Sequence, residues 1–208
     1  MSLKEIEKKY GKGVLMDASF LLEEERNYIP VAYPLDIALK GGGVSEGSIV
    51  LISGKEGSGK TTTALTLAKN AQKKECGSRK IIYSDIECRL KRSTLEGVQG
   101  LDFTSTEKFQ VIRSTLDTIL TGEQHLNLIM DLLKSTPKAV FIIDSASALA
   151  SALELEGEVR PDFRANMPKM LASFCRHIAP IVLLQKSVLV ILQRLIADSS
   201  GKTMGLQE

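Results

Sequence analysis

Short apolar runs alternate with segments of helical periodicity along most of the chain. An apolar run without polar alternation is typical of a strand that is covered on both faces, as in a parallel sheet. Four such runs are interpreted as strands: residues 49–52, 81–87, 139–144 and 188–193.

Apolar residues recur at helical spacing in the segments that precede or separate these runs. These segments are 3–10, 62–74, 109–120, 126–133 and 163–178, with a helix and turn at 95–101. Strands that alternate with helices form βαβ units with right-handed crossovers. The sequence therefore predicts an α/β fold with a mainly parallel central sheet flanked by helices, preceded by a short N-terminal helix.

The first predicted strand runs directly into a glycine-rich loop and then into a helical segment. Gly54, Gly59, Lys60 and Thr61 fit the pattern G-x-x-x-x-G-K-[ST], in which backbone N–H groups and a helix start surround phosphates. Lys60 would bridge the terminal phosphates, and Thr61 would ligate Mg²⁺. The residues expected to contact the nucleotide in this loop are Gly54, Lys55, Glu56, Gly57, Ser58, Gly59, Lys60, Thr61 and Thr62.

Polar residues end the other predicted strands, and the carboxyl ends of parallel strands meet at one edge of a sheet. Asp144 follows five apolar residues and is the expected partner of Thr61 in holding Mg²⁺, because a hard cation needs oxygen ligands. Glu87 is the candidate for activating the attacking water, and Asp85 is its rival, expected on the same side of the strand. Gln193 is expected to sense the γ-phosphate.

Composition and charge fit a globular intracellular protein. Hydrophobic residues make up 43% of the 208 residues and charged residues 25%, and the net charge of +2 gives no general attraction to nucleic acid. The three cysteines are widely spaced, which favours neither a disulfide framework nor a zinc site. A charged N-terminus and the lack of an apolar run of membrane-spanning length predict a cytoplasmic protein with no membrane partner.

Taken together, these motifs resemble the RecA recombinase family, including its phage-encoded members. The similarity runs from the N-terminus to near the end of the chain. Its parts are residues 6–13 (N-terminal helix), 35–43 (entry to the core), 54–61 (phosphate loop), 85–87 (catalytic glutamate), 144–145 (magnesium aspartate), 154–158 (first DNA-binding loop) and Gln193 (nucleotide-sensing glutamine). The second DNA-binding loop would then be 194–208.

The resemblance implies a P-loop ATPase that forms a filament on single-stranded DNA, pairs it with duplex DNA and exchanges strands, using ATP and Mg²⁺. Residues 1–34 would form an N-terminal helix and linker for oligomerisation, and residues 35–208 an ATPase core that is incomplete at its C-terminus. The candidates for DNA contact are Arg160, Arg164, Arg194 and Lys202.

Three departures from the family pattern qualify this interpretation. Lys91 and Thr94 stand where the family has an acidic residue and an aromatic beside the adenine, and Pro161 and Phe163 alter the first DNA-binding loop. The sequence also ends at Glu208, inside the second loop, so we expect weak hydrolysis by a truncated chain. Two alternatives therefore stay open: a hexameric helicase-type ATPase, and a non-hydrolysing nucleotide-binding modulator of a recombinase filament.

Overall fold

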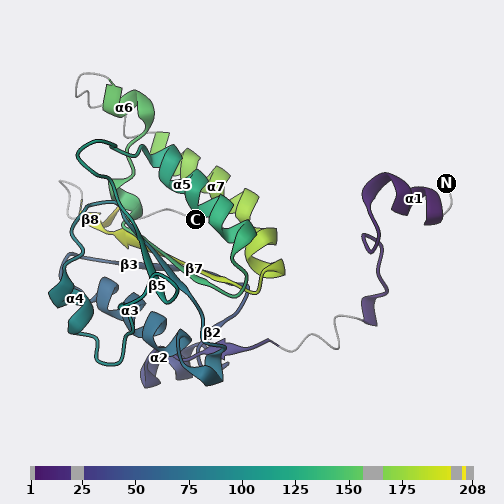
Figure 1. The fold of residues 1–208 in the computed structure, drawn as a ribbon, viewed down its shortest axis with the longest axis horizontal. Coiled ribbons are helices and arrows are strands. Elements are labelled where there is room, and N and C mark those ends of the chain that lie inside the picture. Colours follow the sequence, from purple (N-terminus) through teal and green to yellow (C-terminus); the bar gives the residue numbers. More distant parts are fainter. Residues whose placement is uncertain (1–2, 20–25, 157–165, 198–202, 205–208) are drawn as a thin grey trace.

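A parallel five-stranded sheet forms the centre of the protein. The structure, a computed structural model, describes residues 3–19, 26–156, 166–197 and 203–204. The strand order is β3-β7-β6-β4-β5, and all neighbouring pairs are parallel (Figure 1). The bounds are β3 (Ile49–Gly54), β4 (Ile81–Asp85), β5 (Phe109–Ile112), β6 (Val140–Asp144) and β7 (Val188–Arg194). The predicted fold class is confirmed.

Helices cover both faces of this sheet, which explains why its strands are apolar on both sides. Along β6, Val140 and Ile142 join the core on one face, while Phe141 and Ile143 join the core on the other. The first face carries α3 (Lys60–Ala71) and α4 (Arg92–Glu96), and the second carries α5 (Gly122–Ser135) and α7 (Asn166–Leu184) (Figure 1). The inner strands β4, β6 and β7 are buried on both faces along most of their length, whereas the edge strands β3 and β5 have exposed positions such as Leu51 and Val111.

The helix predicted over residues 109–120 is wrong. The structure has strand β5 there, hydrogen-bonded to β4 with Ile81 opposite Phe109, followed by an irregular segment. Phe109 and Ile112 are buried, whereas Leu116 is fully exposed and Ile119 largely so. The helical spacing of apolar residues in this stretch was therefore accidental, and the free edge of β4 decided the local structure because it offers backbone partners.

Other boundaries differ by a few residues or add short elements. The strand predicted to reach Glu87 ends at Asp85, and α4 begins before the predicted 95–101 segment. The remaining elements are α2 (Tyr33–Ala38), α6 (Ala152–Glu156), the 3-10 helices η2 (Lys74–Cys76) and η3 (Ala146–Ala148), and the antiparallel pairs β1 (Tyr28–Ile29) with β2 (Val44–Ser45) and β8 (Ile196–Ala197) with β9 (Thr203–Met204).

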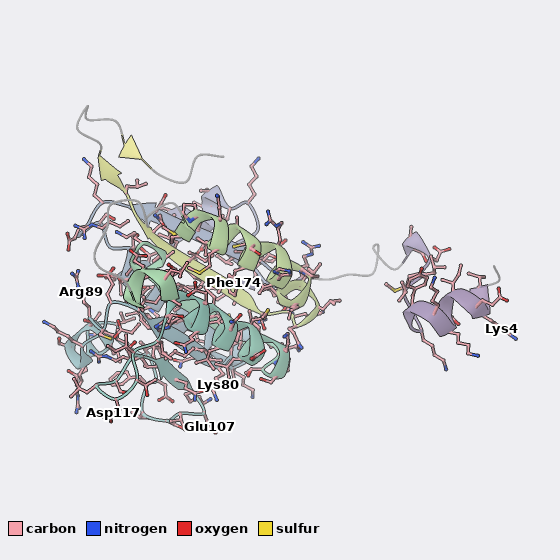
Figure 2. The ribbon with its side chains drawn as sticks, turned by 90° about the horizontal axis from the view of Figure 1, so that it is seen from above. Lys4, Lys80, Arg89, Glu107, Asp117 and Phe174 are labelled. Carbon is pink, nitrogen blue, oxygen red and sulfur yellow. The ribbon has the colours of Figure 1, made fainter. Side chains whose placement is uncertain are left out.

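The N-terminal helix α1 (Leu3–Tyr10) is present as predicted but buries none of its residues. Figures 1 and 2 both show it apart from the sheet, and Figure 2 shows its Lys4 far from Arg89 at the margin of the core. Leu3 and Tyr10 are exposed apolar residues on this helix. A helix this short gains little stability by itself, so it needs another surface to pack on.

Helix α7 is the one helix in the described residues that is long and apolar enough to cross a membrane by length and composition. The sequence shows no apolar run of membrane-spanning length, so such a helix was not predicted from it. Four of its residues, Leu171, Phe174, Ile178 and Val182, are buried in the core on the α5 side of the sheet. These residues recur every three or four positions, as expected for a helix that packs one face against a sheet.

A buried ion pair joins the segment before β3 to the segment before β4. Arg79 donates to Glu46 Oε2 at 2.6 Å, and the two side chains are 2% and 3% exposed. Arg79 also donates to the carbonyl oxygens of Cys76 and Lys186. Burial alone would raise the pKa of Glu46, but hydrogen bonds from Arg79 and Asn27 outweigh it and hold that pKa below its usual value.

We expect Arg79→Met to lower the free energy of unfolding by about 3 kcal/mol, because it leaves Glu46 Oε2 buried without its partner, while Asn27 at 3.2 Å and Lys186 at 3.7 Å contact only the other oxygen, Oε1. Urea denaturation measures this. The control is Arg92→Ala, which removes an exposed arginine paired to Glu96 on the surface and should change stability by less than about 1 kcal/mol. Adding Glu46→Gln to Arg79→Met should recover part of the loss. Equal stability of Arg79→Met and the unmodified chain would contradict the assigned role.

Candidate nucleotide-binding site

A cavity of about 260 Å³ opens at the carboxyl ends of the parallel strands. The loop after β3 and the start of α3 form one wall, and the ends of β4, β6 and β7 form the others. The basic residues that line it are Lys60, Arg89 and Arg194. The acidic ones are Glu56, Asp85, Glu87 and Asp144. The cavity therefore combines segments that are far apart in the sequence.

The glycines of the loop have the backbone geometry that a phosphate cradle needs. Gly57 and Gly59 have φ angles of 74° and 85°, a conformation that side chains disfavour, and a Cβ on Gly54 would lie 2.6 Å from Ser58 Oγ. Gly59 is the N-cap residue of α3 and provides no side-chain cap, so the first-turn N–H groups of the helix are available to an anion.

Lys60 bends back over this loop from the first position of α3. Its Nζ donates to the carbonyl oxygens of Gly54 at 2.9 Å and Lys55 at 2.8 Å. The ammonium is thereby fixed at the mouth of the cradle, next to the N-terminus of the helix. Both features attract negative charge to the same point.

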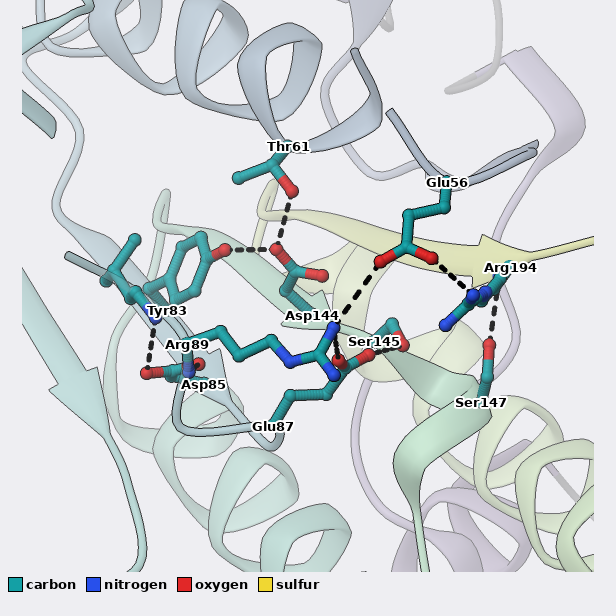
Figure 3. Close-up of polar contacts among 11 residues, drawn as sticks. Glu56, Thr61, Tyr83, Asp85, Glu87, Arg89, Asp144, Ser145, Ser147 and Arg194 are labelled. Atoms are coloured by element: carbon teal, nitrogen blue, oxygen red, sulfur yellow. Dashed lines mark hydrogen bonds and ion pairs between the residues drawn. The ribbon is translucent and has the colours of Figure 1, made fainter. Parts of the chain in front are cut away.

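Thr61, Asp144 and Tyr83 form a hydrogen-bonded cluster across the cavity (Figure 3). Thr61 Oγ1 donates to Asp144 Oδ2 at 2.8 Å, and the Tyr83 hydroxyl donates to the same oxygen. A hydroxyl and a carboxylate are hard oxygen donors, which is the chemistry that Mg²⁺ requires, so these residues fit that ion. Burial and the Asp144 charge raise the pKa of Tyr83, so its phenol stays protonated and remains a donor.

Asp85 and Glu87 have different surroundings, contrary to the expectation that they share one side of a strand. Asp85 is 2% exposed, and its two oxygens accept the backbone N–H groups of Arg89 at 2.9 Å and Leu90 at 3.0 Å. Glu87 lies beyond the end of β4, is 24% exposed and accepts from Ser145 Oγ at 2.7 Å. Both residues line the cavity, but the oxygens of Asp85 hold the backbone of the following loop, whereas the carboxylate of Glu87 lies between Ser145 and Arg89 (Figure 3).

Comparison with known proteins identifies the family to which this arrangement belongs. The family model of the RecA N-terminal domain matches residues 1–201. The chain belongs to the RecA family. It is 29% identical over 210 residues to Protein RecA of Thermus thermophilus, covering 100% of this chain and 57% of that protein. Against Protein RecA of Caldanaerobacter subterraneus it is 30% identical over 201 residues, covering 94% and 54%.

A third relative is the mitochondrial DNA repair protein recA homolog of Dictyostelium discoideum, 31% identical over 195 residues and covering 93% of this chain and 40% of that protein. The chain spans about half the length of the curated relatives it matches. Family membership therefore rests on the match to the N-terminal domain of RecA proteins. The matched residues of this chain include its phosphate loop and its acidic strand ends.

Gln193, the glutamine that the RecA resemblance assigns to nucleotide sensing, lies outside the lining of the cavity. It is 8% exposed in β7, opposite Ser53 of β3. Its Oε1 is buried and has no hydrogen-bond partner among the residues that the structure describes. Its role in sensing stays a prediction.

The four predicted DNA contacts are only partly within the described structure. Arg160, Arg164 and Lys202 lie outside the described residues. Arg194 ends β7 and contacts Glu56 of the phosphate loop, and its backbone N–H donates to Ser147 Oγ at 2.9 Å (Figure 3). In this arrangement its guanidinium lies at the nucleotide cavity.

The sequence interpretation missed two residues of the site. Tyr83 lies two positions before Asp85 in β4, but a tyrosine within an apolar run gives no signal of a polar role. Arg89 is a surface arginine in a basic segment, and only the fold brings it to Glu87 and Glu56. Thr94 lines the cavity as well, while Lys91 lines a neighbouring one.

Proposed function

We propose that this chain binds Mg²⁺-ATP at the carboxyl edge of its sheet and hydrolyses it in a DNA-dependent reaction of the recombinase type. The observation that carries the proposal is the phosphate loop with its Thr61–Asp144 hydrogen bond of 2.8 Å, which joins residues 83 positions apart. The glycine conformations and the position of Lys60 at the start of α3 support it. Membership of the RecA family supports the choice of ATP.

Each residue of the cavity has a proposed role. The first-turn N–H groups of α3 and the Lys60 ammonium would bind the phosphates. Thr61 and Asp144 would hold Mg²⁺, which when bound supplies positive charge to the phosphate oxygens. Glu87 would orient the attacking water and accept its proton, and Ser145 would fix the direction of that carboxylate through its hydrogen bond.

DNA strand exchange and self-assembly are further parts of the proposal. The names of the relatives support a role in recombination and repair. Because the net charge is only +2, binding to a polyanion would depend on contacts repeated along an assembly. Residues 1–34 would mediate that assembly, since α1 has an apolar stripe and no buried residue. The location proposed is the cytoplasm of a bacterium or of a phage-infected host.

A nucleotide-binding modulator that does not turn over ATP is the second candidate. One observation favours it: both oxygens of Glu87 already have partners, Ser145 at 2.7 Å and Arg89 at 3.0 Å. While both contacts last, neither oxygen is open to an attacking water. Turnover therefore requires that one of these contacts be released.

The deciding experiment measures ATP hydrolysis by the purified chain with and without single-stranded DNA. We expect hydrolysis that rises when DNA is added. Binding of ATP without turnover under either condition would favour the modulator and overturn the ATPase proposal. Negative-stain microscopy of the same samples distinguishes a helical filament, which we expect, from the closed ring of a hexameric helicase-type ATPase.

A further inference from the structure

We propose that Arg89 binds the terminal phosphate of the bound nucleoside triphosphate, and thereby lets the site distinguish a triphosphate from a diphosphate. The inference rests on the proposed nucleotide site and adds a specificity-determining cation to it. Arg89 belongs to the same chain as the phosphate loop, so the contact needs no neighbouring subunit.

The backbone of Arg89 is anchored by the buried carboxylate of Asp85. Its backbone N–H donates to Asp85 Oδ1, and the next N–H donates to the other oxygen of the same carboxylate. Asp85 is itself buried at the end of β4, and Arg113 donates to the Cys88 carbonyl oxygen on the other side of the turn. The backbone that carries Arg89 is therefore fixed at the rim of the cavity.

The side chain, by contrast, is free to change partners. It is 68% exposed and reaches into the cavity between two carboxylates, with its guanidinium 3.0 Å from Glu87 Oε2 and 3.7 Å from Glu56 Oε1 (Figure 3). Exposed ion pairs of this kind contribute little to stability, so exchanging one acceptor for another costs little. The guanidinium can follow an anion that enters the cavity.

The terminal phosphate is the acceptor that this position favours. The proposed water-activating residue, Glu87, must lie beside the phosphorus atom that the water attacks, which is the terminal one. A guanidinium in contact with Glu87 lies on that side of the nucleotide. Phosphate oxygens match the planar fork of arginine with two parallel hydrogen bonds, which a pair of separate carboxylates does not offer.

The exchange also has a consequence for Glu87. Without nucleotide, Arg89 and Ser145 occupy its two oxygens. Transfer of Arg89 to the terminal phosphate leaves Glu87 with Ser145 alone and with one oxygen open to water. A diphosphate lacks the group that draws Arg89 away, so the contact between Arg89 and Glu87 persists in that state.

The test compares the dissociation constants of the slowly hydrolysed analogue ATPγS and of ADP, both with Mg²⁺, by calorimetry on the full chain. We expect Arg89→Ala to weaken ATPγS binding about tenfold or more, while ADP binding changes less than about twofold. Arg89→Lys keeps the charge but not the fork and should give an intermediate loss for ATPγS.

Arg92→Ala is the matched control, because Arg92 lies three positions further on and pairs with Glu96 at the surface of α4. It should change neither constant. Equal losses of ATPγS and ADP affinity in Arg89→Ala, or no loss of either, would overturn the inference while leaving the nucleotide site intact. If the unmodified chain binds neither nucleotide, the proposed function fails, and the inference fails with it.

Discussion

Replacing Lys60 by alanine is expected to abolish nucleotide binding in practical terms, with a loss of at least about 100-fold in affinity for Mg²⁺-ATP. The ammonium is held at the mouth of the phosphate cradle by the carbonyl oxygens of Gly54 and Lys55, where it can turn to a phosphate. Two charge-assisted hydrogen bonds lost together account for a change of this size. Calorimetric titration measures it.

The control for this variant is Lys74→Ala, which removes the same charge from the exposed 3-10 helix η2 and should leave affinity unchanged. Circular dichroism on both variants establishes that α3 is retained. Wild-type affinity in Lys60→Ala would contradict the proposed role of the phosphate loop and, with it, the proposed ATPase. A loss shared by both variants would instead point to general charge rather than to the site.

The second large effect concerns Glu87. Glu87→Gln should leave ATP affinity within about threefold and reduce DNA-stimulated turnover by about 10²–10⁴-fold, the usual contribution of a general base. The amide has the size of the carboxylate, and its oxygen can still accept from Ser145 Oγ, so the side chain stays in place. Single-turnover hydrolysis of labelled ATP measures the change.

Asp85→Asn is the informative comparison, because Asp85 uses both oxygens to hold the backbone that carries Arg89 and Leu90. An amide can accept only one of those two bonds well, so we expect a lower thermal midpoint of unfolding in this variant. Normal turnover in Glu87→Gln together with a catalytic defect in a folded Asp85→Asn protein would move the role of base to Asp85.

Part of this site could be read from the chain because its parts are contiguous. In the segment 54–61 the spacing of the glycines, the lysine and the threonine determines where each group lies, because the segment is a turn followed directly by the start of a helix. The start of α5 carries a local signal as well, the capping box of Thr121 and Gln124, but it was not recognised, and the helix was predicted to begin only at residue 126. Short-range signals of this kind need no knowledge of the remaining fold.

The pairing of Asp144 with Thr61 needed one further step. It follows from the rule that parallel strands deliver their carboxyl ends to one edge, once the apolar runs are interpreted as strands. The structure brings the two side chains together, with Thr61 Oγ1 donating to Asp144 Oδ2 at 2.8 Å, and their joint role in holding Mg²⁺ stays a prediction. The same rule failed to separate Asp85 from Glu87, because the strand stops at Asp85 and the chain then turns.

The sequence by itself determined the fold class, the strand–loop–helix order around residues 54–61 and four of the five strands of the sheet, because periodicity and motif spacing are local properties of the chain. Tertiary structure alone decided that residues 109–112 form a strand beside β4, that Tyr83 donates to Asp144, and that Arg89 lies between Glu56 and Glu87. These features depend on which segments become neighbours in space, and backbone pairing and charge contacts between distant segments leave no periodic trace in the sequence.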